Sequence, residues 1–257
     1  MPKLSLQLIG RATVRRSDES RQGIPPSLKP LLGFLSLEPT GHCHRERLIT
    51  ALWPEETTEV GRRRLNTMVW RARKLFGCDR DEVLQVHRNG SMSINTNRIR
   101  IDVVEALADL SRDTCSDAIA GDARAIGRLR QAVRIETEDF LTECYHEWVL
   151  QARDRLIRNL LRALETLISI APTLDQAIQW SELLLLRDPL REDVHRRLIK
   201  LYLRAGRRTA ALRQYETCRR VLRDELGVEP LPETYLAAAP ARLGSSVDGN
   251  EDRLEPV

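Results

Sequence analysis

The stretch Glu59–Phe76, EVGRRRLNTMVWRARKLF, decides how the first part of this chain folds. A turn of about 100° per residue gathers its apolar side chains into one stripe. The stripe consists of Leu65, Met68, Val69, Ala72, Leu75 and Phe76. Most of the cations fall on the other faces. The stretch therefore predicts an amphipathic helix that packs its stripe on a core and turns its cationic side toward a polyanion.

The side of this helix opposite the stripe holds the candidate DNA contacts. The groove-facing candidates are Arg63, Thr67, Trp70, Arg71 and Lys74. The candidate phosphate contacts beside them are Arg62, Asn66 and Arg73. Two other interpretations stay open: Arg62–Arg64 also fits a solvated helix face, and Trp70 would be a core residue if the helix were rotated. We favour exposure of Trp70, because the better-filled apolar stripe lies opposite it.

A β-hairpin is predicted shortly after this helix. In Val83–Ile94, VLQVHRNGSMSI, apolar residues alternate on both sides of Asn89-Gly90. Asn-Gly is the strongest short-range hairpin signal, and we expect a type I′ turn in which both residues have positive φ angles. Arg88 at the tip is a candidate wing contact with DNA, although an ordinary turn residue would look the same.

The residues before this helix complete a recognisable order of elements. Alternation in Leu4–Ile9 and Ala12–Arg15 predicts a small antiparallel sheet, and Leu28–Leu37 and Arg45–Trp53 read as short helices. A small sheet, three helices and a hairpin with a basic tip follow the order of a winged helix-turn-helix. We expect residues 1–101 to form this DNA-binding domain.

The charge of the chain is unevenly distributed. Residues 1–101 contain 18 Lys and Arg against 10 Asp and Glu, a net charge of +8, and the remaining 23 against 27 give −4. An excess confined to one half favours an anionic partner for that half. The overall composition, with 42% hydrophobic and 30% charged residues, is that of a soluble protein long enough for two domains.

The second half is expected to be entirely helical. Short amphipathic segments, Val103–Leu110 and Ala123–Val133, lead to a long helix at Glu147–Ala171. Beyond it, Asp175–Ile178 returns weakly as Thr209–Leu212, an offset of 34 residues. That period is typical of tetratricopeptide (TPR) helical hairpins. The fold class predicted for the whole chain is therefore mainly α: an N-terminal winged helix-turn-helix with a small β-sheet and a β-hairpin wing, then a TPR-like all-α domain at residues 102–243.

These residues resemble a known family. The first domain is similar to a winged helix of response-regulator type. The second resembles the bacterial transcriptional activation domain in several motifs: Phe140-Leu141 with Glu147-Trp148, Asp188–Glu192, Tyr202 with Ala205-Gly206, Ala211–Tyr215 and Glu225–Pro230. Together they resemble the antibiotic-regulatory-protein (SARP) family of bacterial transcription activators over roughly residues 4–240.

The resemblance implies a sequence-specific activator that binds promoter repeats, often as a homodimer, and recruits RNA polymerase holoenzyme. By analogy with related winged helices, the acidic loop Glu55–Glu59 is a candidate polymerase contact. Larger members of the family append a nucleotide-binding domain, and no Gly-x-x-x-x-Gly-Lys-Ser/Thr motif occurs in this sequence. The chain departs from the usual family pattern at Trp70, which bears on target preference, and at Met92, which bears on wing packing. Two alternative functions stay open: a TPR-like protein-interaction adaptor and a small-molecule-sensing regulator.

Candidates for chemistry are weak, and we expect neither an enzyme nor a cofactor. His42-Cys43-His44 invites a metal interpretation, but adjacent residues rarely converge on one ion. The carboxylates Glu136, Glu138 and Asp139 lack a nearby histidine or nucleophile and fit a helix start better. Four aromatic residues are assigned to helix packing rather than to a ligand pocket: Trp148, Trp180, Tyr202 and Tyr215.

The remaining features concern location. Five scattered cysteines without a Cys-x-x-Cys pair indicate reduced thiols. No membrane span or signal peptide is recognised, so we expect a bacterial cytoplasmic protein associated with the nucleoid. The polar stretch 244–257 is expected to be a disordered tail.

Overall fold

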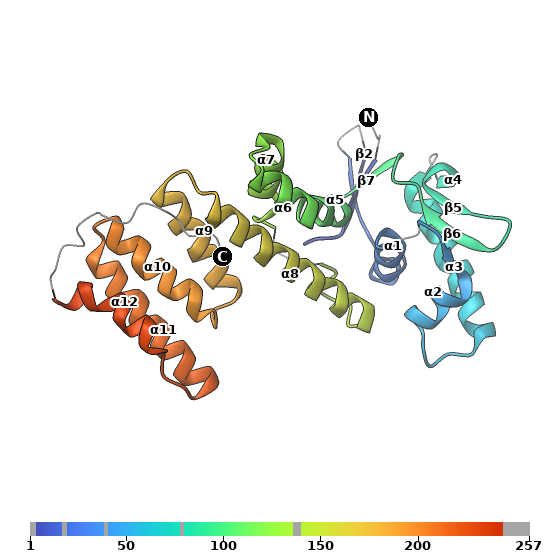
Figure 1. The fold of residues 1–257 in the computed structure, drawn as a ribbon. Helices are drawn as coiled ribbons and strands as arrows, with labels where there is room; N and C mark the ends of the chain where they lie inside the picture. Colours follow the sequence, from blue (N-terminus) through green and yellow to red (C-terminus); the bar gives the residue numbers. More distant parts are fainter. Residues whose placement is uncertain (1–3, 17–19, 39–40, 78–79, 136–139, 244–257) are drawn as a thin grey trace. The chain divides into compact units, whose positions relative to one another are not determined.

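The computed structural model describes residues 4–16, 20–38, 41–77, 80–135 and 140–243 (Figure 1). Two compact units account for the chain: unit 1 comprises residues 1–109 and 134–157, and unit 2 comprises residues 110–133 and 158–257. Unit 1 contains the winged helix-turn-helix, and unit 2 is built from helices alone in its described residues. The predicted fold class is confirmed.

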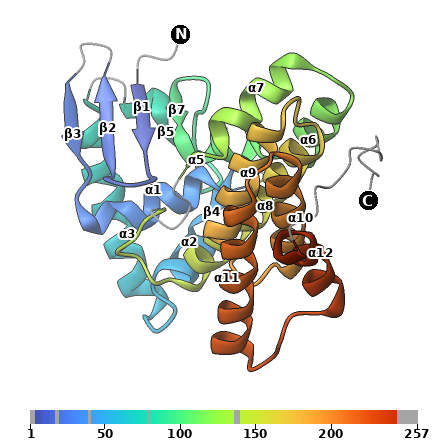
Figure 2. The same cartoon turned by 90° about the vertical axis from the view of Figure 1, so that its left-hand side faces the viewer.

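Unit 1 contains a four-stranded sheet with the strand order β3–β2–β1–β7 (Figure 2). The strands β1 (Leu4–Gln7), β2 (Thr13–Arg16) and β3 (Arg21–Gly23) are antiparallel, and β7 (Ile99–Ile101) runs parallel to β1. The antiparallel pair β1–β2 was expected. The other two strands were not, because three residues are too few to show a periodic pattern.

Three helices of unit 1 follow in the expected order. The short turn η1 (Pro26–Leu28) leads into α1 (Lys29–Ser36), which is followed by α2 (Arg45–Leu52) and α3 (Thr58–Phe76). Pro30 stands in the first turn of α1, where a helix needs no N–H donor. All six residues of the predicted stripe of α3 are buried.

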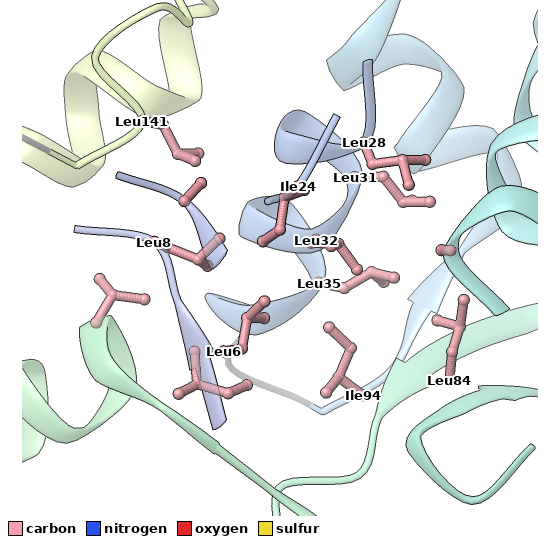
Figure 3. Packing of buried hydrophobic residues seen from close by; sticks show 14 of the residues in the cluster. Leu6, Leu8, Ile24, Leu28, Leu31, Leu32, Leu35, Leu84, Ile94 and Leu141 are labelled. Carbon is pink, nitrogen blue, oxygen red and sulfur yellow. The ribbon is translucent and has the colours of Figure 1, made fainter. Parts of the chain in front are cut away.

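The core of unit 1 brings together side chains from the four-stranded sheet, from α1 and from the strands that follow α3. Figure 3 shows Leu6 and Leu8 from the first strand region close to Leu32 and Leu35 of α1. Leu141, from the segment before α8 (Glu147–Ser169), belongs to the same cluster. The core of unit 1 therefore includes residues that lie well beyond position 101.

The wing is a hairpin, as predicted, but its turn is of another kind. The strands β5 (Leu84–Val86) and β6 (Ser91–Ile94) pair antiparallel with Val86 opposite Met92. Only Gly90 of the turn has a positive φ, at 81°, and its N–H donates to His87 O at 2.9 Å. The expected type I′ turn is therefore wrong.

A type I turn followed by a left-handed glycine fits these bonds, and it is the common three-residue hairpin loop. Asn89 instead uses its side chain: Oδ1 accepts from the N–H of Ser91 at 3.0 Å and from its hydroxyl at 2.7 Å. A further strand, β4 (Cys43–His44), pairs with β6, which makes a three-stranded sheet in the order β4–β6–β5. The short helix α4 (Arg80–Val83) precedes β5.

Residues after position 101 are bonded into unit 1. Asp102, the first residue of α5 (Asp102–Asp109), accepts the N–H groups of Leu8 and Ile9 at 2.9 Å through its carboxylate. Burial raises the pKa of Asp102, and these hydrogen bonds oppose that shift. Further on, the guanidinium of Arg153 donates to Phe140 O at 2.8 Å and to Leu141 O at 2.6 Å.

Unit 2 is a stack of helices. It contains α6 (Arg112–Ile119), α7 (Ala123–Ala132), the later part of α8, α9 (Leu174–Arg187), α10 (Glu192–Arg204), α11 (Arg208–Leu226) and α12 (Pro232–Leu243). Helix α10 packs against α9, α11 and α12. Ala177 and Ala211, which correspond across the 34-residue offset, are both buried. This arrangement agrees with the expected TPR-like helical hairpins.

The motif Glu225–Pro230 forms the end of α11 and the turn after it. Gly227 adopts a left-handed conformation with φ of 70°, and its N–H donates to Arg223 O at 3.0 Å. Glycine adopts this conformation without the steric cost that other residues meet. Glu229 then pairs with Arg219 at 2.9 Å and with Arg223.

The division into units bears on the predicted domains without testing them. Residues 102–109 and 134–157 belong to unit 1, although they follow the expected boundary at 101. The predicted domains, residues 1–101 and 102–243, stay predictions. The expected tail at 244–257 lies outside the described residues. Within the described part of the chain, none of the helices combines the length and the hydropathy that a bilayer span requires.

Candidate nucleic-acid interface

The outer face of α3 is open to solvent. Arg63, Thr67, Trp70, Arg71 and Lys74 are all exposed, and each was expected to face a groove. The side chain of Arg63 keeps 78% of its accessible surface, and Trp70 as a residue keeps 63%. The rotated-helix alternative, in which Trp70 belongs to the core, is thereby excluded.

The flanking candidates are less uniform. Arg62 and Asn66 are exposed, whereas Arg73 is half-buried. The amide oxygen of Asn66 accepts a hydrogen bond from Arg45 Nη1 at 3.1 Å, so α2 fixes the orientation of this side chain. Arg45 and Asn66 therefore form one polar contact between the two helices of the helix-turn-helix.

Three consecutive arginines of α3 are paired with glutamates. Arg62 Nη2 lies 3.2 Å from Glu46 Oε1 on α2. Arg63 Nη2 lies 2.5 Å from Glu59 Oε1 on the same helix. Arg64 Nη1 lies 2.7 Å from Glu56 Oε1 in the preceding loop. Hydrogen bonds from its own backbone N–H, the larger cause, and from the Arg62 side chain hold the pKa of the Glu46 carboxyl below its usual range. Exposed pairs of this kind are individually weak. A phosphate group can therefore replace each carboxylate as the partner of the guanidinium.

Trp70 and Lys74 form a second arrangement on the same face. They are one helical turn apart, and Lys74 Nζ lies 5.6 Å from the centroid of the Trp70 ring. A cation over an indole face is attracted by the ring quadrupole, so the pair presents an apolar ring and a positive charge together.

The wing supplies one exposed cation. Arg88 is exposed in the turn at the hairpin tip, as expected. Its neighbour His87 points back into the hairpin, where Nε2 lies 2.9 Å from Ser93 Oγ and 3.1 Å from His42 Nδ1. The hairpin tip is thus held by side-chain bonds while Arg88 faces solvent.

Those candidates for other chemistry that the structure describes do not come together. Cys43 is buried, and burial raises the pKa of its thiol to about 11, while His44 is exposed and His42 contacts His87. In the described ranges no cluster of three or more His, Cys, Asp or Glu side chains is arranged for a metal ion. Glu136, Glu138 and Asp139 lie outside those ranges.

The four aromatic residues assigned to packing each contact different side chains. Trp148 lies edge-on to Phe34 at 5.2 Å between ring centroids, and Arg130 lies 5.5 Å from the Trp180 ring centroid. The hydroxyl of Tyr202 donates to Glu182 at 2.5 Å, and the ring of Tyr215 contacts that of Tyr235.

The glutamates that pair with α3 were not assigned to this role from the sequence. The pair Glu59–Arg63 has the spacing of one helical turn and was recognisable in principle. Glu46 and Glu56 come from other segments, so only the packing of α2 and the loop against α3 brings them near Arg62 and Arg64.

Comparison with known proteins agrees with this architecture. The sequence profile of the bacterial transcriptional activator domain matches residues 101–239, more than half of the chain. Regulatory protein AfsR of Streptomyces griseus is 27% identical over 234 residues, which cover 90% of this chain and 24% of that protein. Regulatory protein AfsR of Streptomyces coelicolor is 28% identical over 241 residues, covering 89% and 23%. The chain thus spans about a quarter of the length of these curated relatives.

A solved structure has the same fold. The structure of Mycobacterium tuberculosis EmbR in complex with a low affinity phosphopeptide matches with a TM-score of 0.64 at 24% identity. The match covers 96% of this chain and 67% of that chain. At this level of identity the likeness concerns the fold alone.

Proposed function

The chain belongs to the bacterial transcriptional activator domain family, and on that premise we propose that it binds promoter DNA sequence-specifically through α3 and activates transcription. The observation that supports this proposal best is the division of α3. Its apolar stripe is buried in unit 1, while Arg63, Trp70 and Lys74 face solvent. An amphipathic helix of a winged helix-turn-helix that presents cations outward has the geometry to enter a major groove.

The contacts divide into two kinds. Arg62, Asn66 and Arg73 of α3 and Arg88 of the wing contact phosphates, and these contacts fix the register of the protein on the duplex. The second kind reads bases from the groove-facing positions. Arginine and lysine suit guanine edges, and the ring of Trp70 suits a thymine methyl or a sugar. The base readers are Arg63, Thr67, Trp70, Arg71 and Lys74.

The assembly is also part of the proposal. Two copies bind repeated half-sites in the promoter and together recruit RNA polymerase holoenzyme, as the family relationship favours. A regulator of promoter DNA works where the chromosome is, so we place the protein at the nucleoid in the bacterial cytoplasm. Neither a catalytic step nor a cofactor is part of this function.

Of the three glutamates in the acidic loop, Glu55 is best suited to a test of the polymerase contact. Glu56 and Glu59 pair with arginines of α3, so reversing their charge would change DNA binding as well. Glu55→Lys is expected to leave affinity for the duplex within about twofold while lowering transcription in a purified polymerase assay. Unchanged transcription would remove this contact from the proposal.

Selection of bound fragments from a random duplex pool tests DNA recognition itself. The full chain is expected to enrich one short motif, repeated at a fixed spacing if two copies bind together. Selection with the Arg63→Ala, Lys74→Ala double variant serves as the matched comparison and is expected to lose the motif. Absence of enrichment, with protein partners bound by the full chain instead, would favour the adaptor alternative.

A further inference from the structure

An open pocket of about 470 Å³ lies in unit 1 against the proposed DNA-binding helix. Its apolar wall consists of Leu52 and Trp53 at the end of α2 together with Met68 of α3. Its volume falls within the range of small-molecule sites in proteins, about 300–1,000 Å³. The sequence offered no sign of it, because its lining comes from η1, α1, the end of α2, α3 and the segment before α8.

The charged groups that line this pocket are all cationic or imidazole. Arg63, Arg64 and Arg71 come from α3, and His146 comes from the segment before α8. No carboxylate is among the described lining residues. Apolar surface bounded by guanidinium groups fits a ligand that combines an apolar body with an anionic group.

Arg71 is the guanidinium best placed to bind such an anion. Arg63 and Arg64 already pair with Glu59 and Glu56. Within the described residues Arg71 is exposed and has no ion-pair or hydrogen-bond partner. Its five donors are therefore available, and they suit the planar geometry of a carboxylate or the oxygens of a sulfonate.

We propose that this pocket binds a small organic anion with an aromatic or branched aliphatic body, and that this ligand competes with DNA. The apolar wall gives the body a place to bury surface, which a free inorganic anion would not use. The second part rests on the proposed function, because Arg63, Thr67 and Arg71 line the pocket and are also groove-facing candidates. One side chain cannot give the same donors to the ligand and to a base or phosphate at once, so each partner lowers the affinity of the other.

The anionic dye 8-anilino-1-naphthalenesulfonate is a suitable probe for the pocket. It has an aromatic body and one sulfonate, and its fluorescence increases when it leaves water. We expect the full chain to bind it saturably at one site. Arg71→Ala should weaken binding about tenfold, the loss of roughly one charge-assisted contact.

Two controls locate the site and identify its chemistry. Arg213→Ala removes an exposed guanidinium from a second hollow in unit 2, lined also by Arg207 and Arg208, and should leave dye affinity unchanged. The uncharged analogue N-phenyl-1-naphthylamine should bind more weakly than the sulfonate. Non-saturable binding, equal affinity in Arg71→Ala, loss in Arg213→Ala or equal binding of the neutral analogue would each overturn the proposal.

A competition experiment separates this proposal from the proposed function. DNA affinity of the full chain is measured first without dye, on the duplex recovered by selection. Dye added at ten times its dissociation constant should then raise the apparent Kd for that duplex about tenfold. Dye binding that depends on Arg71 in a chain without DNA affinity would preserve the pocket and refute the proposed function. DNA binding unaffected by bound dye would refute competition.

Discussion

At the scale of single residues, Glu56 and Glu59 set how freely α3 can meet a polyanion. Each carboxylate neutralises an arginine of the proposed interface and repels phosphate. Glu56→Gln and Glu59→Gln should therefore strengthen binding to any duplex, each by about 0.5 kcal/mol, because a surface pair is weak but a phosphate nearby feels the removed charge. Fluorescence anisotropy at fixed salt measures the effect.

The matched control for these two variants is Glu105→Gln. Glu105 also pairs with an arginine of unit 1, at 2.8 Å from Arg100 Nε, but on α5 rather than α3. Its removal should leave DNA affinity unchanged. If all three variants bind equally tighter, the effect is one of net charge, and the ion pairs of α3 have no special part.

His195 provides a residue-scale prediction for unit 2. It is buried, with Nε2 at 3.0 Å from Pro189 O and Nδ1 at 2.5 Å from the amide nitrogen of Gln214. Because that amide nitrogen can only donate, Nδ1 accepts and Nε2 carries the proton, so the ring is neutral. Burial lowers the pKa of His195 below its ordinary value of 6.5.

The sign of the pH dependence follows from this lowered pKa. Below pH 6.5 the unfolded chain binds a proton at His195 that the folded chain does not bind, so folding loses stability as the pH falls toward the folded-state pKa. The melting temperature of the full chain should therefore decrease between pH 7 and pH 5. His195→Gln should flatten this slope, whereas the exposed His44→Gln should retain it. An equal slope in all three proteins would contradict the assignment.

At the scale of elements, the packing of α2 on α3 depends on Gly61. A Cβ at this position would overlap Ile49 Cγ2, which no packed side chain tolerates. Gly61→Ala should therefore force the two helices apart and destabilise unit 1 by about 1–3 kcal/mol, despite a helix-propensity gain of about 1 kcal/mol. DNA affinity should also fall, because α3 would be displaced from its packing position against α2.

Gly127 is the matched control for this substitution. It lies inside α7, and nothing approaches within 4 Å of the Cβ that alanine would add. Gly127→Ala should raise the free energy of unfolding by up to about 1 kcal/mol. Urea unfolding of both variants measures the difference, and a Gly61→Ala protein as stable as Gly127→Ala would refute the proposed helix contact.

The sequence predicts an element best when the pattern that specifies it lies within that element. The helix α3 was predicted with its buried stripe because one segment contains the whole 3.6-residue pattern. The strands β3 and β7 were missed. Each has only three residues, and only pairing with β2 or β1 identifies it as a strand. The exposure of Trp70 followed from periodicity, but the glutamates near Arg62 and Arg64 did not, because tertiary packing brings them there.

At the scale of the whole molecule, unit 1 includes residues that follow the domain boundary predicted at residue 101. Asp102 binds the N–H groups of Leu8 and Ile9, and Phe140 and Leu141 are buried in unit 1. A fragment that ends at residue 101 lacks Asp102, Phe140 and Leu141. The N–H groups of Leu8 and Ile9 then lose their acceptor, and apolar core surface becomes exposed. We therefore expect residues 1–101 alone to unfold without a cooperative transition, because buried donors lose their partners and the core loses part of its cover.

A fragment that ends at Ser169 keeps these contacts and serves as the comparison. It contains all of unit 1 and the whole of α8. Thermal unfolding followed by circular dichroism should show a cooperative transition for residues 1–169 and none for residues 1–101. Equal melting temperatures would mean that the boundary at residue 101 is also a folding boundary.

The proposal that the outer face of α3 binds DNA is tested most directly by the salt dependence of affinity for the selected duplex. Each phosphate contact contributes about 0.9 to the slope of log K against log salt concentration. Compared with the unmodified chain, Lys74→Ala should bind more weakly with a slope reduced by about that amount if Lys74 contacts phosphate, or lose preference at one base pair if it contacts a base edge. Lys200→Ala, an exposed lysine of α10, should bind like the unmodified chain. If Lys74→Ala and Lys200→Ala have the same affinity, the same slope and the same sequence preference as the unmodified chain, the cationic face of α3 is merely solvated and the proposal is wrong.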